Sequence, residues 1–154
     1  GSLIEESSLM YAKELIKNPK IIVPETVVVS DSPEKKGRII HVNSLNKNES
    51  IFDIAPEALY ELKPIIQNSG TILWNGPIGF FEKENFARGT LMIADMIVSS
   101  KSFSVLGGGD TIAAAEKAGV IDKIDYVSTA GGAFLEFMEG KKLPAVEALI
   151  DKFN

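Results

Sequence analysis

The sequence has no cysteine and a single histidine in 154 residues. The absence of cysteine excludes a disulfide framework and thiolate metal sites, and it fits a reducing compartment. No apolar run approaches the roughly 20 residues that a helix needs to span a bilayer, and the acidic first segment shows no signal peptide. We therefore expect a cytoplasmic protein with no membrane partner.

An excess of positive charge is also missing. The chain carries 16 Lys and Arg against 21 Asp and Glu, a net charge of −5, with both signs mixed along its length. Proteins that bind nucleic acid more often present a basic field, so we expect no nucleic-acid partner. The 45% of hydrophobic and 24% of charged residues are typical of a globular domain, and the length is sufficient for a substantial core.

The first third of the chain predicts a helix and a few short strands. Leu9, Ala12 and Leu15 recur at helical spacing and predict a helix over residues 5–17, which Asn18–Pro19 would end. Apolar runs predict strands over residues 21–23, 26–29 and 38–42. The last two enclose a polar loop and form a small β excursion near residues 26–42.

From residue 51 onward, helical and strand patterns alternate. A helix is expected to start at Asp53–Pro56, with Pro64 kinking or dividing it. Further strands are predicted over 71–74, 102–106 and 126–128, and further helices over 84–98, from Gly109 to Lys117, around Leu135–Met138 and over 144–153. Such alternation indicates parallel pairing through right-handed crossovers. We predict an α/β fold, a three-layer Rossmann-like parallel sheet that is part of a doubly wound domain.

Three glycine-containing loops follow the predicted strands: WNGPIGFFE (74–82), LGGGDT (106–111) and STAGGA (128–133). The carboxyl ends of parallel strands share one edge of a sheet, where open α/β sheets bind ligands. Helix starts offer unpaired N–H groups, and glycine lets a phosphate approach them closely. Gly108, Gly109 and Thr111 therefore predict a phosphate loop, in which Asp110 would cap the helix or hold Mg²⁺ that the phosphates bring.

Each loop taken alone has a plainer interpretation. Gly-Gly-Gly-Asp after a strand is also a common tight turn with an aspartate cap, and neither a Walker nor a GxGxxG motif is present. Ile78, Phe80 and Phe81 would form an apolar wall for a flat ring, with Glu82 accepting hydrogen bonds from ribose hydroxyls. Alternatively, the phenylalanines belong to the core and Glu82 is an exposed charge. The convergence of three loops favours a binding site.

The ordered set of motifs resembles the C-terminal, nucleotide-binding half of phosphoglycerate kinase. The matching segments, in family order, are DIAP (53–56), TILWNGPIGFFE (71–82), FARGT (86–90), GGGDT (107–111), DK (122–123), STAGGA (128–133), LEFMEGK (135–141) and LPAVEAL (143–149). Each motif is weak by itself, but the whole series is specific and covers nearly the entire chain.

This resemblance implies a phosphoryl transfer between 1,3-bisphosphoglycerate and ADP that gives 3-phosphoglycerate and Mg-ATP. It implies that Glu82 holds the ribose hydroxyls, that Pro77 and Phe80 line the base and sugar site, and that Asn75 lies near the phosphates. It further assigns the phosphate contacts to Gly108, Gly109 and Thr111, the metal to Asp110, and the phosphoryl group in flight to Gly131 and Gly132.

Two departures from the family pattern stand out. Ala130 replaces the first of three consecutive glycines, which would be costly if that position required a positive φ. The chain also lacks the N-terminal lobe that binds 3-phosphoglycerate and the lysine-bearing start of the nucleotide lobe. We therefore interpret residues 1–154 as a truncated C-terminal nucleotide-binding domain of a two-lobe kinase, whose full-length form is expected to be a monomer.

The truncation leads to two expectations. The fragment alone should be inactive, and it should self-associate, because the absent strands would lie between residues 21–23 and 71–74 and would leave unpaired edges. Two alternatives remain open: a non-catalytic module that binds a nucleotide or phosphate, and a structural α/β fragment with no competent site.

Overall fold

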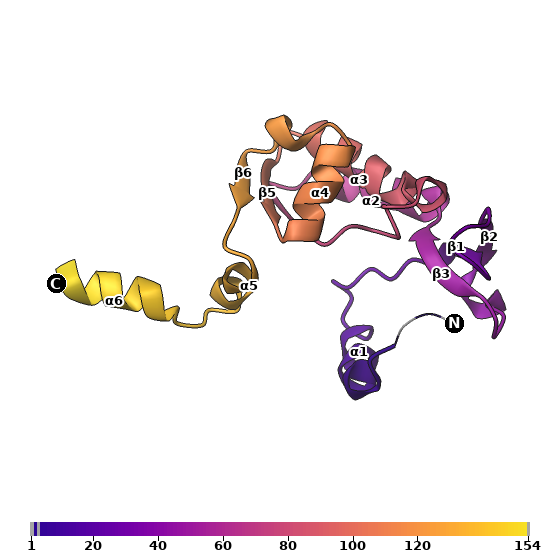
Figure 1. Cartoon of the computed structure of the whole chain (residues 1–154), viewed down its shortest axis with the longest axis horizontal. Coiled ribbons are helices and arrows are strands. Elements are labelled where there is room, and N and C mark those ends of the chain that lie inside the picture. The colour runs from indigo at the N-terminus through magenta and orange to yellow at the C-terminus, as the bar shows by residue number, and fades with distance from the viewer. Residues whose placement is uncertain (1, 3, 154) are drawn as a thin grey trace. The chain divides into compact units, whose positions relative to one another are not determined.

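The computed structural model describes residues 2 and 4–153, and the side chains of all of these except 151 and 153. The chain divides into two compact units. Figure 1 labels their helices and strands. Unit 1 consists of Gly1–Ile65 and Ile78–Ile93, and unit 2 of Ile66–Pro77 and Ala94–Asn154.

Unit 1 starts with the 3-10 helix η1 (Glu6–Ser8) and helix α1 (Leu9–Leu15), inside the range predicted as helical. The strand predicted over residues 21–23 is wrong, because these residues have no regular structure. The Ile21 N–H donates instead to the Asn18 carbonyl, at 2.9 Å, in a turn. Apolar, β-branched residues favour a strand only where a neighbouring strand is available to pair with them.

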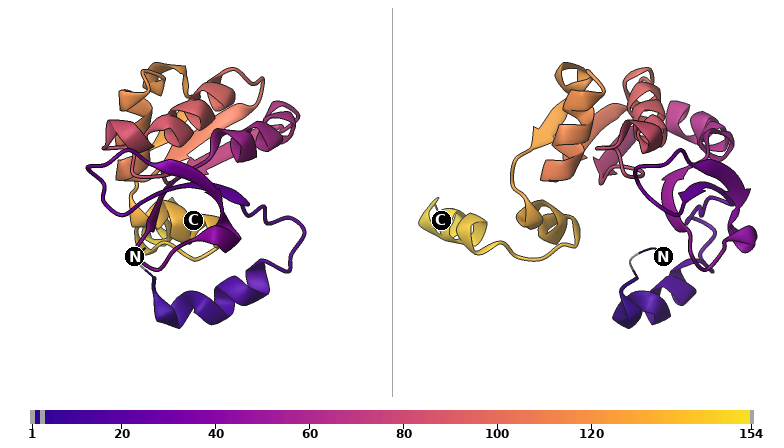
Figure 2. Two further views of the ribbon diagram at one scale, coloured as in Figure 1. Left: turned by 90° about the vertical axis from the view of Figure 1, so that its right-hand side faces the viewer. Right: turned by 45° about the vertical axis from the view of Figure 1, so that its right-hand side comes forward.

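An antiparallel sheet with the strand order β2-β1-β3 forms the centre of unit 1 (Figure 2). Its strands are β1 (Thr26–Ser30), β2 (Arg38–His41) and β3 (Ser50–Ile54), and the 3-10 helix η2 (Val42–Ser44) follows β2. Val27, Val29 and Ile40 are buried together and form its core, and Val42 packs against them. The alternation of buried and exposed residues is that of a sheet with one face on the core.

Strand β3 extends the predicted β excursion from residue 42 to residue 54 and corrects the helix start predicted at Asp53. Asp53 lies inside β3, paired with Val28 of β1, and helix α2 (Pro56–Gln67) begins at Pro56. The predicted division of this helix at Pro64 is absent, since α2 is continuous to Gln67. Pro64 stands close to the helix end, where a missing N–H removes a single hydrogen bond.

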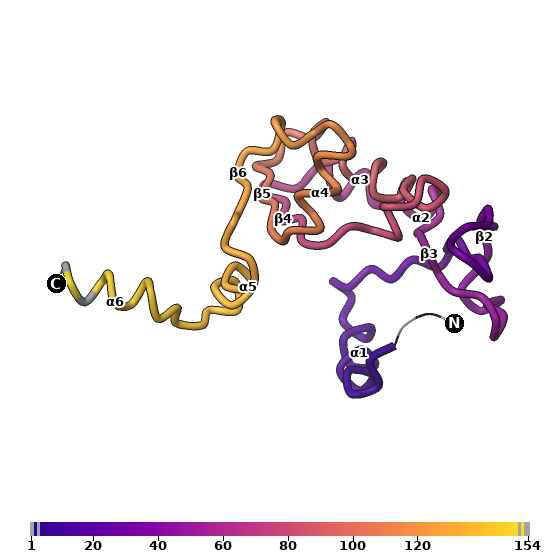
Figure 3. The backbone as a smooth tube through the Cα atoms, viewed as in Figure 1, coloured from indigo at the N-terminus to yellow at the C-terminus, as the bar shows by residue number. Residues whose placement is uncertain are grey.

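Unit 2 contains the parallel sheet that the alternating pattern predicted. Its order is β4-β5-β6, with β4 (Thr71–Asn75), β5 (Phe103–Gly107) and β6 (Tyr126–Ser128). Between β4 and β5 in sequence come η3 (Glu84–Phe86), which belongs to unit 1, and α3 (Arg88–Val98), whose residues up to Ile93 belong to unit 1 and the rest to unit 2. The other helical segments of unit 2 are α4 (Gly109–Lys117) and η4 (Ile121–Lys123) between β5 and β6, then α5 (Gly132–Met138) and α6 (Pro144–Phe153). Figure 3 traces this alternation along the backbone. The predicted α/β class is confirmed.

The core of unit 2 lies between the central strand and the helix that follows it. Leu106 of β5 and Ala114 and Ala115 of α4 are completely buried. Asp125 holds Ser104 of β5 in place. Its carboxylate accepts hydrogen bonds from the Ser104 N–H and hydroxyl, both at 2.7 Å. Among the described residues, no helix has the length and apolar character needed to cross a membrane.

Candidate functional site

The parallel register of unit 2 brings three loops to one edge of its sheet. Asn75, the last residue of β4, is the partner of Gly107 in β5, and Gly107 is the partner of Ser128 in β6. The three strands therefore end level with one another. This confirms that the three loops leave the same edge, where ligands of α/β sheets bind.

The loop after β5 turns sharply into helix α4. Gly108 is the N-cap residue of α4 and has φ 91° and ψ 137°, a conformation that favours glycine. No side chain caps this helix, so the alternative that Asp110 is the cap is wrong; Asp110 lies in the first helical turn and is exposed. A Cβ on Gly109 would meet open space. Gly109 and Asp110 are both exposed, so the start of α4 faces solvent.

Thr111 connects this loop to the one that follows β4. Its side chain is buried, and its hydroxyl oxygen accepts a hydrogen bond of 2.7 Å from the Gly76 N–H. Trp74 fixes the same turn by donating from Nε1 to the Gly76 carbonyl at 2.9 Å. A Cβ on Gly108 would lie 3.4 Å from Thr111 Oγ1 and 3.5 Å from Asn75 Nδ2. The structure therefore brings together the predicted residues Asn75, Gly108 and Thr111.

The loop after β6 places its left-handed residue at Gly131. Gly131 is the N-cap of α5, with φ 56°, and Gly132 is the first residue of that helix. In the described part of the chain only glycines have positive φ. Ala130 therefore carries no conformational penalty, and the family's extra glycine is not needed here.

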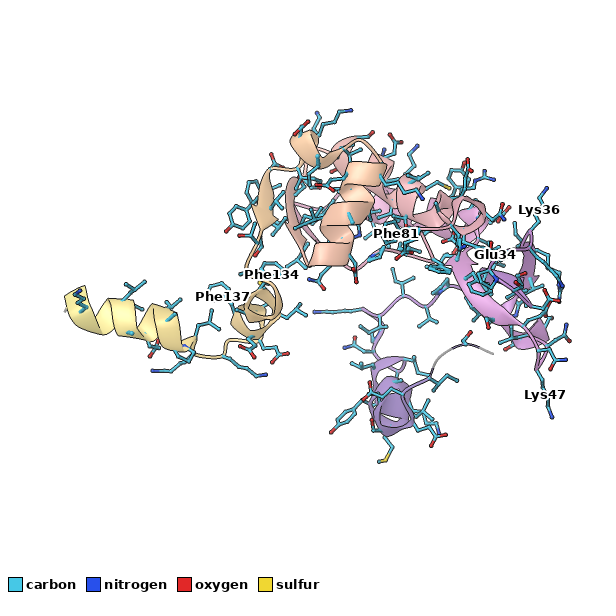
Figure 4. All side chains as sticks on the ribbon, viewed as in Figure 1. Glu34, Lys36, Lys47, Phe81, Phe134 and Phe137 are labelled. Carbon is cyan, nitrogen blue, oxygen red and sulfur yellow. The ribbon has the colours of Figure 1, made fainter. Side chains whose placement is uncertain are left out.

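Phe134 was not predicted as part of this region. The ring of this α5 residue lies against Gly107, where any Cβ would collide with it, and the side chain is buried (Figure 4). Sequence reasoning missed it because a phenylalanine at helical spacing indicates only a core position. The Phe134 ring therefore requires a glycine at position 107, the last residue of β5.

The apolar half of the WNGPIGFFE loop belongs to unit 1, except for Pro77, which is half-buried in unit 2. Phe81 is 6% exposed, which confirms for this residue the alternative that the phenylalanines belong to the core (Figure 4). Phe80 is 36% exposed and Glu82 is exposed.

Ile78 lines a cavity of about 340 Å³ in unit 1. The other residues around this cavity are Ile22, Val23, Pro24, Glu25, Ile54, Ala58, Glu61 and Leu62. A mostly apolar hollow of this size is typical of small-molecule sites. The one sign of this cavity in the sequence is the apolar run at residues 21–23, which predicts a strand that the structure does not have.

A metal would have few protein ligands here. No group of three or more His, Cys, Asp or Glu side chains that could hold an ion occurs among the described residues. Asp110 is the one carboxylate in the loop at Gly108–Thr111. This donor set fits Mg²⁺, which is usually bound by one or two carboxylates and the phosphates of a nucleotide.

Asp53 is a buried carboxylate that was not predicted as functional. Its side chain is 2% exposed, and it accepts hydrogen bonds from the N–H groups of Gly89, at 2.8 Å, and of Ile54, at 2.9 Å. Burial raises the pKa of Asp53 from 3.8 to about 6, although these two hydrogen bonds act to lower it. A buried carboxylate charge lowers the free energy of unfolding. Carboxyl groups with a pKa shifted in this way are more typical of functional regions than of a core.

Comparisons with known proteins agree on one family. The family model of phosphoglycerate kinase matches residues 1–141. The phosphoglycerate kinase of Baumannia cicadellinicola subsp. Homalodisca coagulata is 46% identical over 151 residues, which make up 98% of this chain and 39% of that protein.

Solved structures give the same result. The structure of phosphoglycerate kinase from Coxiella burnetii is similar with a TM-score of 0.87 and 42% identity, over 95% of this chain and 40% of that one. The crystal structure of the kinase from Pyrococcus horikoshii OT3 has a TM-score of 0.80 and 36% identity, over 93% of this chain and 36% of that one. The chain thus spans about two fifths of the length of these relatives.

The raised pKa of Asp53 predicts a pH-dependent stability. Between pH 4 and pH 6 the folded chain binds this proton and the unfolded chain does not, so the free energy of unfolding should fall as the pH rises through this window. The change from 3.8 to about 6 corresponds to about 3 kcal/mol. Urea titrations should give the free energy of unfolding of Asp53→Asn and of the wild type. The value for the variant minus that for the wild type should increase by about this amount from pH 4 to pH 7. A difference that does not vary with pH would contradict the prediction.

Proposed function

The chain belongs to the phosphoglycerate kinase family, and we propose that residues 1–154 are the nucleotide-binding part of a two-lobe cytoplasmic enzyme. The reaction of the whole protein is the transfer of a phosphoryl group between 1,3-bisphosphoglycerate and ADP, which gives 3-phosphoglycerate and ATP. Because the chain covers 39% of the length of a relative, 3-phosphoglycerate would bind through the N-terminal lobe, which is not part of this chain. We expect no nucleic-acid partner, since the net charge is −5.

The phosphate end of the proposed site is unit 2. The observation that supports it most is the uncapped start of α4 at Gly108–Gly109, beside the Thr111 hydroxyl and the Asn75 side chain. The partial positive charge of a helix N-terminus attracts phosphate oxygens. Thr111 accepts a hydrogen bond from Gly76 and retains its own hydroxyl hydrogen, which is free to be donated to a phosphate.

The base and the ribose are assigned to residues of unit 1 and to Pro77. The apolar cavity of about 340 Å³ at Ile78 has the character that a flat base requires. Phe80 is partly exposed beside it in sequence, and the exposed Glu82 carboxylate would accept hydrogen bonds from both ribose hydroxyls.

The chemistry asks the protein for position and charge rather than for a covalent step. Mg²⁺, when bound with the nucleotide, would neutralise charge on the phosphate oxygens, with Asp110 as its carboxylate ligand. The start of α4 would hold the phosphate chain in place. The backbone amides of Gly131 and Gly132 would donate hydrogen bonds to the phosphoryl group during transfer, where charge develops on its oxygens.

Binding of Mg-ADP by the chain itself distinguishes this proposal from a structural fragment. We expect calorimetry to detect binding to the wild type, and Glu82→Ala and Asp110→Ala to weaken it at least tenfold, which is about 1.4 kcal/mol each. Asp122→Ala removes an exposed carboxylate outside the proposed site and should change the affinity less than twofold. Wild-type-like affinity in both site variants would contradict the proposal, and no binding at all would favour a fragment with no competent site.

Turnover distinguishes the enzyme from a module that only binds nucleotide. We expect the chain alone to form no ATP from ADP and 1,3-bisphosphoglycerate above the uncatalysed rate, because the residues for the second substrate belong to the rest of the protein. A coupled assay that follows ATP formation makes the comparison, with an intact family member as the positive control. Activity of the chain near that of the intact enzyme would contradict the proposed division of roles.

We also propose that the chain associates with itself, whereas the full-length enzyme is a monomer. Strand β4 pairs only with β5 in the described sheet, and Leu73 of β4 is 39% exposed. An unpaired edge of this kind is a template for pairing with a second chain. Residues 21–23 form no strand and so provide no second edge. Light scattering should show dimers or larger species that increase with concentration, and a strict monomer at millimolar concentration would refute this.

A further inference from the structure

The buried Asp53 joins three backbone segments of unit 1. From β3 it reaches Gly89, the second residue of α3, and accepts that residue's N–H with Oδ2 at 2.8 Å. Helix starts need such acceptors, and a carboxylate there also interacts favourably with the helix dipole. Asp53 therefore acts as a cap for α3 supplied from a distant strand.

Two glycines allow the backbone to approach this carboxylate. A Cβ on Gly79 or on Gly89 would collide with the Asp53 side chain, and Gly79 has φ 91°. Gly79 lies in the WNGPIGFFE loop, and Gly89 starts the helix after it. Both ends of the segment 79–89 thus pack directly on one carboxyl group.

A β-bulge beside Asp53 adds a second connection. The pairing of β1 with β3 passes from Val28–Asp53 to Val29–Ile51, so that Phe52 has no partner in β1. The Phe52 carbonyl accepts instead from the Phe80 N–H at 2.7 Å. Bulges of this kind redirect groups next to functional sites.

The rings around the bulge hold the same loop. The Phe52 ring stacks on that of Phe80, with centroids 6.1 Å apart and an interplanar angle of 23°, and on that of Phe86 at 4.7 Å and 28°. Aromatic pairs at such separations contribute beyond the area they bury. Phe80 is therefore fixed by both its backbone and its ring.

The start of α3 also holds Ile78, which lines the apolar cavity. The buried Thr90 hydroxyl accepts from the Ile78 N–H at 3.1 Å and donates to the Ile78 carbonyl at 3.2 Å. Displacement of the first turn of α3 would thus displace Ile78. Asp53, which caps that turn, acts on the cavity wall through Gly89 and Thr90.

We propose that Asp53 is a positioning residue, whose buried carboxylate fixes the first turn of α3 and the Gly79 turn and thereby sets the places of Ile78 and Phe80. The consequence for a ligand rests on the proposed nucleotide-binding function. The chemical class of that ligand is a nucleoside diphosphate, whose base would contact Ile78 and Phe80.

Protonation of Asp53 should change the hydrogen bonds that its carboxyl group accepts from Gly89 and Ile54. The ionisable side chains on the segment 79–89 packed against it are Arg88 beside Gly89, and Glu82, Lys83 and Glu84 in the loop. Burial raises the pKa of Asp53, the hydrogen bonds from Gly89 and Ile54 act to lower it, and no charged side chain is among the causes. The pH at which these hydrogen bonds change is therefore a property of this one carboxyl group, with a midpoint at about 6.

The hydrogen bond itself is tested on the wild type by nuclear magnetic resonance. We expect the chemical shift of the Gly89 amide proton to titrate with an inflection near pH 6. In Asp53→Asn this inflection should vanish, and in Asp31→Asn, which changes an exposed carboxylate of the same unit, it should remain. A Gly89 amide that does not titrate in the wild type overturns the proposal, and this result requires no variant to fold.

Positioning is tested by amide hydrogen exchange at pH 7. Asp53→Asn should accelerate exchange at Ile78 and Phe80 at least tenfold and leave the amides between β1 and β2 unchanged. Thr90→Val should accelerate Ile78 alone and preserve the Gly89 titration. Unchanged exchange at Ile78 and Phe80 in Asp53→Asn overturns the proposal, as does equal acceleration throughout unit 1, which would indicate a purely structural role.

The ligand consequence has its own measurement. Calorimetry with Mg-ADP should give an affinity about tenfold lower in Asp53→Asn than in the wild type at pH 7, and the difference should vanish near pH 5. Equal affinities at pH 7 overturn the link between Asp53 and the ligand. If the wild type binds no Mg-ADP, the proposed function fails, and the resonance and exchange measurements still decide whether Asp53 positions the loop.

Discussion

The level ending of three parallel strands is the constraint from which the proposed site follows. Asn75, Gly107 and Ser128 are register partners, so the loops that follow them start side by side although up to 53 residues separate them in sequence. The backbone geometry of a parallel sheet imposes this, whatever the side chains are. The sequence of these loops adds two features. No side chain caps the start of helix α4, and the Thr111 hydroxyl in its first turn accepts a hydrogen bond from the Gly76 N–H.

At several positions of this protein the backbone admits only glycine. Positive φ occurs at Gly108 and Gly131 at the starts of two helices and at Gly76 and Gly79 in the loop after β4. At Gly107 and Gly89 the reason is different, because neighbouring side chains fill the space of a Cβ. The glycines of these loops thus serve tight turns at some positions and tight packing at others.

Much of the fold and part of the site could be predicted from the sequence. The strands at 71–74, 102–106 and 126–128 are short apolar runs that end in glycine or polar turns, and parallel pairing follows from the helices between them. The grouping of Asn75, Gly108 and Thr111 then follows from the strand ends. The resemblance to the family identified the same residues independently, and the comparisons established the family over residues 1–141.

The failed predictions depended on tertiary context. Ile21–Val23 has strand-forming residues but no strand to pair with, and Asp53 resembles a helix cap in sequence although it is buried in a strand and caps a different helix. Phe81 and Phe80 are adjacent and chemically identical, yet only Phe81 is buried. Local propensity does not distinguish these cases, because packing against distant segments decides them.

The central claim is that the start of α4 receives the phosphates of a nucleotide, and amide chemical shifts test it most directly. Titration of the labelled chain with Mg-ADP should shift the backbone amides of Gly109, Asp110 and Thr111, whereas adenosine, which has the base and ribose but no phosphate, should leave them in place. Equal responses to both ligands, or no response of these three amides to Mg-ADP, would contradict the account.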